Sequence, residues 1–435
     1  METRVVLRLN STGKGFEAQF EELLASKREV SEDVDQVVRD IIDNVRLKGD
    51  EAVLEYTSRF DRLDAASMAE LSVTEAEIDT ALNSVPADTL EALKLAHDRI
   101  AAHHRRQKPQ NDRYTDEIGV ELGSLWTAVE AVGVYVPGGL ASYPSSVLMN
   151  VVPAKVAGVE RIVMVVPSPD GVLNPLVLAA AKVAGVTEIY RIGGAQAVAA
   201  LAYGTETIAP VAKIVGPGNA YVAAAKRRVF GTVGIDMIAG PSEVLVIADG
   251  DNNADWVAAD LLAQAEHDTA AQSLLITDSE DLADQVEIAV ESQLKTLPRE
   301  DVARASWQDF GAIILVDDLD AAMPLANRIA PEHLELAVAD PEALLTKVRN
   351  AGAVFLGHYT PEAIGDYVGG SNHVLPTARS ARFSSGLSVL EFVKRTSILK
   401  CNADNLRALG PAAIALGESE GLSAHARSVS IRLNM

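Results

Sequence analysis

Residues 155–166, Lys-Val-Ala-Gly-Val-Glu-Arg-Ile-Val-Met-Val-Val, decide the fold, and their opening phrase Lys-Val-Ala-Gly-Val returns at 182–186. In each copy an Ala-rich segment reaches a glycine, the residue that commonly ends a helix, and an apolar run follows. A short run without polar alternation is typical of a strand that is buried on both faces. The repeated phrase therefore predicts successive helix–strand units of a parallel sheet.

Two series of short apolar runs extend this pattern along the chain. Helical segments separate most of the runs, and the residues up to about 110 have a helical periodicity. The predicted fold class is α/β, with two similar parallel-sheet, incomplete Rossmann-like domains plus a small N-terminal helical region and a C-terminal appendage. Strands are expected at 131–136, 161–166, 188–192 and 213–215 in the first domain, and at 244–248, 273–277, 312–316, 334–338 and 353–356 in the second.

The composition describes an acidic chain of 435 residues, long enough for two or more domains. Lys and Arg total 38 against 61 Asp and Glu, which argues against nucleic acid or an anionic membrane surface as the main partner. The single cysteine, Cys401, excludes a disulfide framework and a multi-cysteine zinc site, and its apolar neighbours favour a packed thiol. No apolar run is long enough for a bilayer and no signal-peptide pattern is present, so a cytoplasmic protein is expected.

Three loops that follow predicted strands of the first domain could bind a ligand, because parallel sheets bind ligands at the carboxyl ends of their strands. They are Tyr135 to Gly139, Gly193 to Gln196, and Gly216 to Asn219. The last two lead into helix starts, which favour phosphate. Plain turn geometry for the glycines and a helix cap at Asn219 remain open alternatives. No G-x-G-x-x-G phrase occurs, so a Rossmann dinucleotide site does not follow from a motif.

A second group of residues could hold a metal ion and move protons. Gln264 and His267 share one face of a predicted helix, and with Asp366 and His425 they offer an amide oxygen, two imidazoles and a carboxylate. A solvated helix face is the open alternative. Glu332 and His333 precede a predicted strand and offer two titratable groups for different proton transfers, although a solvated loop is also possible.

Eight phrases of the chain carry a resemblance to a known family. They occur in the order found in histidinol dehydrogenase, and the chain resembles that family from about residue 130 to its end, more weakly through the helical start. The phrases are Gly193-Gly194-Ala195-Gln196-Ala197, Gly216-Pro217-Gly218-Asn219, Ala239-Gly240-Pro241-Ser242-Glu243, Gln264-Ala265-Glu266-His267, Pro331-Glu332-His333-Leu334-Glu335, Ser371 to Thr377, Ala381 to Leu387, and Glu420-Gly421-Leu422-Ser423-Ala424-His425.

The resemblance implies the last two steps of histidine biosynthesis: oxidation of L-histidinol through L-histidinal to L-histidine, with two NAD and one zinc. It also implies a homodimer whose active site is shared between the subunits. Residue by residue, it implies zinc ligands at Gln264, His267, Asp366 and, from the partner subunit, His425. It implies proton transfer by Glu332 and His333, NAD contacts from Tyr135, Gln196 and Asn219, and substrate contacts from Ser242, Gln264, His267, His333, Asp366, Glu420 and His425.

The same resemblance implies a division of the chain into regions. We expect an N-terminal helical and connecting region at 1–30 and 108–133, and an NAD-binding α/β domain at 134–238. The zinc and substrate domain is expected at 31–107 and 239–385, and an appendage that reaches the partner's active site at 386–435. Neither nucleic acid nor a membrane is expected as a partner.

The implied chemistry uses the metal mainly to orient the substrate, with His333 as the base for the alcohol and Glu332 activating the water that adds to the aldehyde. Some relatives carry a cysteine near the position of Val159, and its absence here favours a hydrate over a thiol adduct. Three alternative functions are a zinc- and NAD-dependent dehydrogenase of another alcohol, such as a sulfonated diol, a non-catalytic zinc- or ligand-binding protein, and an NAD-free α/β transferase. His358 and His373 have no assigned role.

Overall fold

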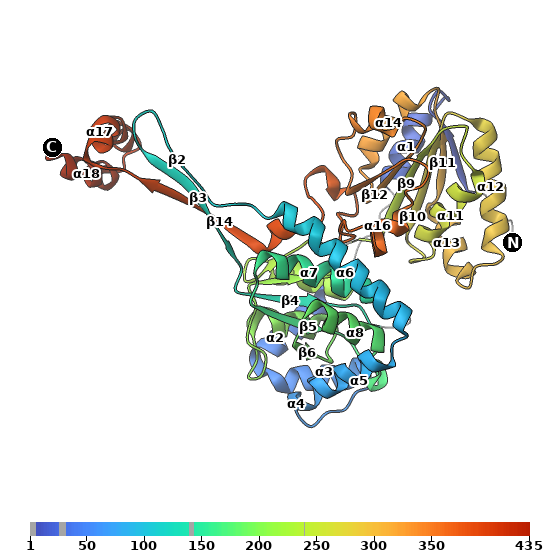
Figure 1. Cartoon of the computed structure of the whole chain (residues 1–435), viewed down its shortest axis with the longest axis horizontal. Helices are drawn as coiled ribbons and strands as arrows, with labels where there is room; N and C mark the ends of the chain where they lie inside the picture. The colour runs from blue at the N-terminus through green and yellow to red at the C-terminus, as the bar shows by residue number, and fades with distance from the viewer. Residues whose placement is uncertain (1–5, 26–31, 139–142, 239) are drawn as a thin grey trace.

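The computed structural model describes residues 6–25, 32–138, 143–238 and 240–435, which form two α/β domains and a projecting arm (Figure 1). The α/β class and the two parallel sheets predicted from the sequence are confirmed. Gly139 and Ala239, which belong to two of the quoted sequence phrases, lie outside the described residues. Within the described residues, no helix combines the length and the apolar character that crossing a bilayer needs.

The first domain contains a five-stranded parallel sheet in the order β6-β5-β4-β7-β8. This is the Rossmann order 3-2-1-4-5 without its sixth strand. The two Lys-Val-Ala-Gly-Val phrases end helices as predicted, because Gly158 and Gly185 are left-handed caps at φ 100° and 77°. The elements are β4 (Ala131–Tyr135), α7 (Pro144–Ala157), β5 (Arg161–Val165), η1 (Pro169–Gly171), α8 (Pro175–Ala184), β6 (Glu188–Tyr190), α9 (Gly194–Tyr203), β7 (Lys213–Val215), α10 (Ala220–Val229) and β8 (Gly234–Ile235).

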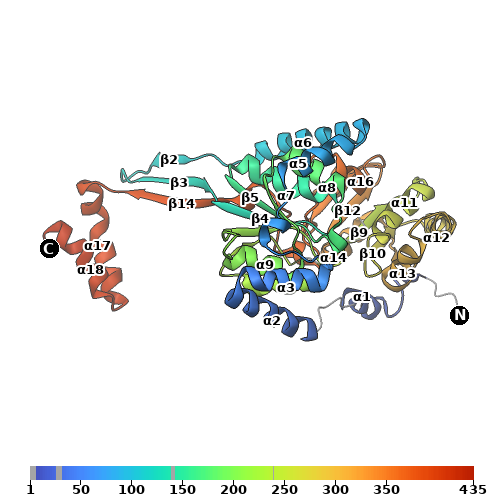
Figure 2. The same cartoon turned by 90° about the horizontal axis from the view of Figure 1, so that it is seen from below.

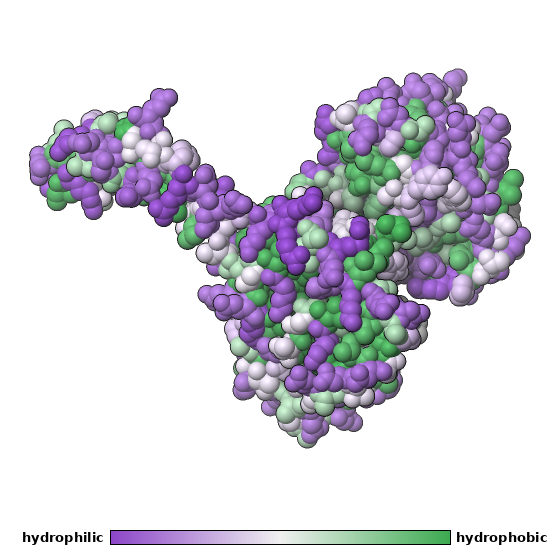
Figure 3. All heavy atoms as spheres, viewed as in Figure 1, coloured by the Kyte–Doolittle hydropathy of each residue, from purple (hydrophilic) through white to green (hydrophobic). Residues whose placement is uncertain are grey.

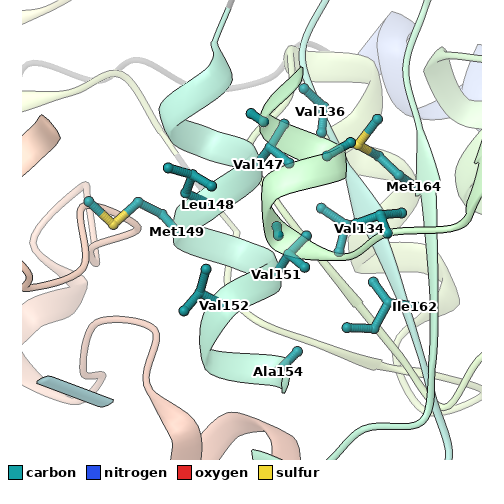
Figure 4. Close-up of a cluster of buried hydrophobic side chains, with 14 of the residues drawn as sticks. Val134, Val136, Val147, Leu148, Met149, Val151, Val152, Ala154, Ile162 and Met164 are labelled. Carbon is teal, nitrogen blue, oxygen red and sulfur yellow. The ribbon is translucent and has the colours of Figure 1, made fainter. Parts of the chain in front are cut away.

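The core of this domain lies on both faces of the sheet. On one face, α7 packs Val147 and Val151 toward Val134, Ile162 and Met164 of β4 and β5 (Figure 4). All five side chains are at most 4% exposed, so each removes most of its apolar surface from water. The other face is covered by α9 and α10, which are rich in buried alanine.

The second domain contains a six-stranded parallel sheet in the order β1-β11-β10-β9-β12-β13. Helices α11, α12 and α13 cover one face, and α1, α14 and α15 cover the other. The elements are β1 (Leu7–Asn10), α1 (Phe16–Ala25), β9 (Glu243–Ala248), α11 (Ala254–Ala265), β10 (Gln272–Thr277), α12 (Glu280–Leu294), α13 (Glu300–Phe310), β11 (Ala312–Leu315), α14 (Leu319–Ile329), β12 (His333–Ala337), α15 (Pro341–Leu345), β13 (Ala353–Leu356) and α16 (Glu362–Tyr367).

The predicted placement of the N-terminal residues was wrong in two ways. Residues 1–30 were expected to be a helical and connecting region, but β1 pairs with β11 and completes the six-stranded sheet. Residues 31–107 were expected in the second domain, but their apolar faces pack on the five-stranded sheet of the first. A helical periodicity identifies which face is buried and not which sheet buries it. The helices are α2 (Glu32–Lys48), α3 (Asp50–Asp61), α4 (Met68–Leu71), α5 (Glu75–Ser84) and α6 (Ala87–Gln107).

The arm is an antiparallel three-stranded ribbon that carries two helices away from both domains (Figures 1 and 2). The space-filling view shows open space between the end of the arm and the second domain (Figure 3). Cys401 is exposed where the ribbon meets the helices, so the expectation of a packed thiol was wrong. The elements of the arm are β2 (Asp112–Thr115), β3 (Glu121–Ala128), β14 (Val393–Lys400), α17 (Ala403–Ser419), α18 (Ser423–Ser430) and η4 (Ile431–Leu433). Two short helical turns precede β14 in the chain, η2 (Ser380–Arg382) and η3 (Val389–Phe392), and Val389 and Phe392 of η3 are buried in the core of the first domain.

Candidate functional site

A cavity of about 1330 Å³ lies where the two domains meet. From the first domain it is lined by residues at or just beyond the carboxyl ends of β4, β6 and β7, including Tyr135, Gln196 and Asn219. The described parts of all three predicted loops therefore meet at one place, as the parallel-sheet topology requires.

Close packing holds the first two loops against each other. The hydroxyl of Tyr135 accepts a hydrogen bond from the backbone N–H of Gly194 at 3.0 Å. Burial raises the pKa of Tyr135 to about 12, so the phenol stays neutral and keeps its own proton available to donate. Gln196 is 1% exposed, and its amide oxygen has no hydrogen-bond partner within the described structure. A buried oxygen without a partner in a cavity wall is suited to receive a donor from a bound ligand.

The loop after β7 is shaped by Gly216 and by Asn219. Gly216 has a φ of 112°, and a Cβ there would lie 2.0 Å from the carbonyl oxygen of Tyr135, so the backbone fills the space that a side chain would need. The side-chain oxygen of Asn219 accepts hydrogen bonds from the N–H groups of Tyr221 and Val222 at 3.1 and 3.2 Å. The helix-cap alternative for Asn219 is therefore realised, and its amide nitrogen is the remaining donor.

A buried ion pair holds Gly216 in place, and the sequence reading missed it. The ammonium of Lys226 and the carboxylate of Asp236 form the pair, with side chains 3% and 1% exposed. Lys226 also donates to the carbonyl oxygen of Gly216 at 3.0 Å, and Asp236 accepts from the N–H of Gly216 at 2.8 Å. The backbone carbonyl and the backbone N–H of Gly216 are thus held by the two partners of one ion pair.

The second domain reaches the cavity with the opposite edge of its sheet. Ser242 immediately precedes β9, and Glu332 and His333 stand at the start of β12, so these residues lie at the amino ends of their strands. His333 is paired with Val244 across the two strands, which brings all three residues together. The rule that parallel sheets use their carboxyl edge therefore describes the first domain and not the second.

His333 lies at the centre of the polar side chains on this edge. Its Nδ1 is 3.0 Å from the carbonyl oxygen of Glu243, which assigns the ring proton to Nδ1 in the neutral form and leaves Nε2 as the basic atom. Nε2 is buried and lies 3.6 Å from the carboxylate of Asp366. Burial lowers the pKa of His333, but the charges of Glu332, Glu362 and Asp366 outweigh burial and hold it well above its ordinary value.

Two buried carboxyl groups flank the imidazole. Glu332 accepts a hydrogen bond from the N–H of Glu243 at 3.0 Å, and burial raises its pKa to about 7. Such a group changes protonation near neutral pH, as an acid–base catalyst needs. Glu362, which the sequence reading missed, lies 3.6 Å from Nδ1 of His333, and burial raises its pKa to about 8. Both carboxyls are at most 5% exposed, which excludes the solvated-loop alternative for Glu332.

Of the predicted metal ligands that lie outside the arm, His267 and Asp366 line the cavity, whereas Gln264 is not among the residues that line it. Gln264 ends the last turn of α11, His267 follows it and lines the cavity, and Asp366 lies in α16 beside His333. Gln264 is 1% exposed, and neither its amide oxygen nor its amide nitrogen has a hydrogen-bond partner within the described structure. A buried amide that makes no hydrogen bond costs free energy, so this observation fits an oxygen ligand for an ion. Across the described ranges, no three His, Cys, Asp or Glu side chains form a ready-made metal cluster.

Glu420 and His425 are not brought to the cavity of their own chain. Glu420 caps the end of α17 and His425 lies in α18, and both are exposed at the end of the arm (Figure 2). The structure does place His373, which had no assigned role, in the cavity wall with His267 and Asp366. His358 lies elsewhere, 3.6 Å from Asp249 beyond the opposite end of the second sheet.

Comparisons with known proteins cover almost the whole chain. A family model described as histidinol dehydrogenase matches residues 24–433. The histidinol dehydrogenases of Brucella suis biovar 1 and Rhizobium meliloti are each 70% identical over 99% of this chain, which covers 100% and 99% of those proteins. A solved histidinol dehydrogenase from Elizabethkingia anophelis is 36% identical, with a TM-score of 0.94 over 99% of this chain and 98% of that one.

Proposed function

The chain belongs to the histidinol dehydrogenase family, and we propose that its cavity oxidises L-histidinol through L-histidinal to L-histidine with reduction of two NAD. The observation that carries the proposal is the meeting of Glu332 and His333 with the loops of Tyr135, Gln196 and Asn219 in one cavity. A proton-transfer pair and a space for a nicotinamide cofactor are the two things that an alcohol and aldehyde oxidoreductase must bring together.

The first domain binds NAD in this proposal, with contacts from Tyr135, Gln196 and Asn219. Two observations support NAD binding by this domain. The buried side-chain oxygen of Gln196 has no hydrogen-bond partner in the described structure, and the backbone of Gly216 lies so close to Tyr135 that no side chain fits there. Bound NAD accepts the hydride in each of the two oxidations.

The second domain holds the zinc through Gln264, His267 and Asp366, and His425 comes from a second copy of the chain. The unpaired amide of Gln264 supports this assignment, because an ion would supply the interaction that the amide lacks. Bound zinc orients the amine and imidazole of the substrate as a template. The same four side chains contact the substrate, together with Ser242 and His333 of this chain and Glu420 of the second copy.

The first oxidation depends on His333. Its Nδ1 donates to the carbonyl oxygen of Glu243, so the ring is fixed with Nε2 free to take the hydroxyl proton of histidinol as the hydride leaves. Asp366, 3.6 Å from Nε2 of His333, would hold the ion, and with its charge neutralised in this way it would no longer favour the protonated imidazole.

The second oxidation depends on Glu332. Its carboxyl group, with a pKa of about 7, takes a proton from the water that adds to the aldehyde, and the resulting hydrate loses the second hydride. Val159 stands near the position where some relatives have a cysteine and is 4% exposed in the core, so no thiol is available there for the alternative adduct.

A homodimer completes the site. The helices of the arm have only four buried residues between them, namely Asn405, Gly410, Gly417 and Ala426. Leu416, Leu422 and Ile431 are each more than 40% exposed, so these helices do not bury an apolar core against their own chain. Seating them on a second copy would bury these residues and would carry Glu420 and His425 to that copy's cavity.

Regional roles and location follow from the same proposal. Residues 134–238 with the helices of 32–107 form the NAD domain, and residues 239–385 with β1 and α1 form the zinc and substrate domain. The arm residues of 386–435 serve the second copy. The enzyme acts in the cytoplasm.

The deciding experiment is the stoichiometry of NADH on mixing the purified, zinc-loaded protein with L-histidinol and NAD. Two NADH per histidinol, with histidine as product and loss of activity to a chelator, are expected. One NADH with free aldehyde would remove the role of Glu332. No turnover with histidinol would overturn the proposed reaction.

A further inference from the structure

The first domain lacks an acid at the place where a Rossmann fold uses one. In that fold a carboxylate about 20 residues after the first loop, near the end of the second strand, binds the hydroxyl groups of the adenosine ribose. Here the second strand is β5, and the residues that follow it are Val166, Pro167 and Ser168. None of the three can provide a carboxylate.

Asp61 from another part of the chain occupies this place. It is the last residue of α3 and 7% exposed, and its carboxylate accepts a hydrogen bond from the backbone N–H of Ser168, directly beyond β5. It lines the cavity together with Tyr135 and Gly193. Asp61 thus places a carboxylate at the end of the second strand, whereas the nearest acid of the local sequence, Asp170, pairs with Arg62 and does not line the cavity.

The carboxylate of Asp61 is not satisfied by the protein. Its Oδ2 is buried and has no hydrogen-bond partner within the described residues, and burial raises its pKa. The neighbouring Arg62 is turned outward, where its guanidinium binds Asp170 through two hydrogen bonds of 2.8 and 2.6 Å. Asp61 is therefore a buried anion with an unused acceptor, and a ligand that offers hydroxyl groups would provide what it lacks.

We propose that Asp61 binds the ribose hydroxyl groups of the adenosine half of NAD and makes the enzyme select NAD over NADP. This inference rests on the proposed use of NAD. A carboxylate accepts hydrogen bonds from a vicinal diol, whereas the phosphate of NADP would place a second anion against the buried carboxylate of Asp61. The selectivity arises from both effects, the gained hydrogen bonds and the repulsion.

Asp61 could also serve only the fold, because its hydrogen bond to Ser168 connects α3 to the loop after β5. The variants must therefore distinguish a structural role from cofactor binding. Asp61→Asn keeps an oxygen for the N–H of Ser168 and removes the charge, so it separates the two roles. Asp61→Ser is the second variant in case the amide disturbs folding. Asp170→Asn is the matched control, since it removes a neighbouring carboxylate that lies outside the cavity.

The test measures kinetics and binding on the same proteins. For Asp61→Asn we expect the KM for NAD to rise roughly tenfold or more with the KM for histidinol little changed, and kcat/KM for NADP to rise. Thermal shift with ADP-ribose, which needs no turnover, should show weaker stabilisation in Asp61→Asn and unchanged stabilisation in Asp170→Asn. Unchanged KM for NAD and unchanged ADP-ribose binding in both Asp61 variants would overturn the proposal. If ADP-ribose binding depends on Asp61 while histidinol is not turned over, only the proposed reaction fails.

Discussion

Nδ1 of His333 lies 3.0 Å from the backbone carbonyl oxygen of Glu243. The same residue, Glu243, donates its backbone N–H to the carboxylate of Glu332 at 3.0 Å. One peptide segment at the start of β9 therefore orients both members of the proposed proton-transfer pair. Because these are backbone groups of a buried strand, the orientation does not depend on the identity of the side chain at 243.

Replacing His333 by Gln should remove the base for the first oxidation. We expect kcat with histidinol to fall roughly 100- to 10,000-fold with a smaller change in KM, as is usual for loss of a general base. Steady-state NADH production at pH values from 6 to 9.5 measures this. A kcat within about threefold of the unmodified enzyme would show that another group takes the hydroxyl proton.

Glu332→Gln should stop the reaction after its first half. The amide cannot take a proton from water, so the variant should release about one NADH per histidinol and let the aldehyde escape. In the unmodified enzyme the second half should slow as the pH falls below about 7, since the raised pKa of Glu332 means that it becomes protonated there. Trapping the aldehyde with a carbonyl reagent checks the prediction, and two NADH per histidinol would contradict it.

The parts of this molecule that sequence could predict are those with local causes. Gly158 and Gly185 end their helices because only glycine takes the left-handed conformation without cost, and the same short phrase appears at both places. Glu332 and His333 were recognisable because they stand at the start of a short predicted strand, directly after the proline that ends the preceding helix. Each inference used a window of fewer than about ten residues.

The parts that sequence could not predict depend on contacts between distant segments. β1 is only four residues long and pairs with β11, which lies about 300 positions later in the chain. No local sequence pattern indicates that pairing. Glu362 and Asp61 are carboxylates of the kind that usually lies in solvent, yet tertiary packing leaves them 2% and 7% exposed. Burial of a carboxyl group is therefore the site property that sequence reveals least.

Gln264→Met should separate metal binding from folding. The buried amide makes no hydrogen bond, so an apolar side chain of similar length should change the stability of the metal-free protein by no more than about 1 kcal/mol. Stabilisation by added zinc should fall, because an oxygen ligand is lost. Thermal melts with and without zinc, and the zinc content after dialysis, provide the measurement.

His358→Gln is the matched control for this experiment. His358 also has a buried ring nitrogen without a hydrogen-bond partner in the described residues, but it does not line the cavity. It should leave zinc binding unchanged. If Gln264→Met lowers metal-free stability and leaves zinc binding intact, the amide is structural and not a ligand.

Lys226→Met should weaken both the fold and NAD binding. It leaves the carboxylate of Asp236 buried without a counter-charge and frees the carbonyl of Gly216, and such a loss costs roughly 3–5 kcal/mol. Urea unfolding should show the loss, and the KM for NAD should rise. Adding Asp236→Asn should recover part of the stability, whereas Arg227→Met on the exposed face of α10 should change it by less than about 0.5 kcal/mol. Equal effects at positions 226 and 227 would show that the pair does not support the loop.

The shared active site predicts that two inactive variants restore each other. Asp366 lies in the cavity of its own chain, whereas His425 lies at the end of the arm, so Asp366→Asn and His425→Asn should damage different halves of each site. A mixed dimer then contains one site with both substitutions and one with neither. Co-expression with two different tags should give roughly a quarter of the unmodified activity, because about half of the dimers are mixed and each has one intact site of two. Isolated mixed dimers should reach about half. If the mixture stays as inactive as the separate variants, His425 does not act in the site of a second copy, and the exposed arm helices require another partner.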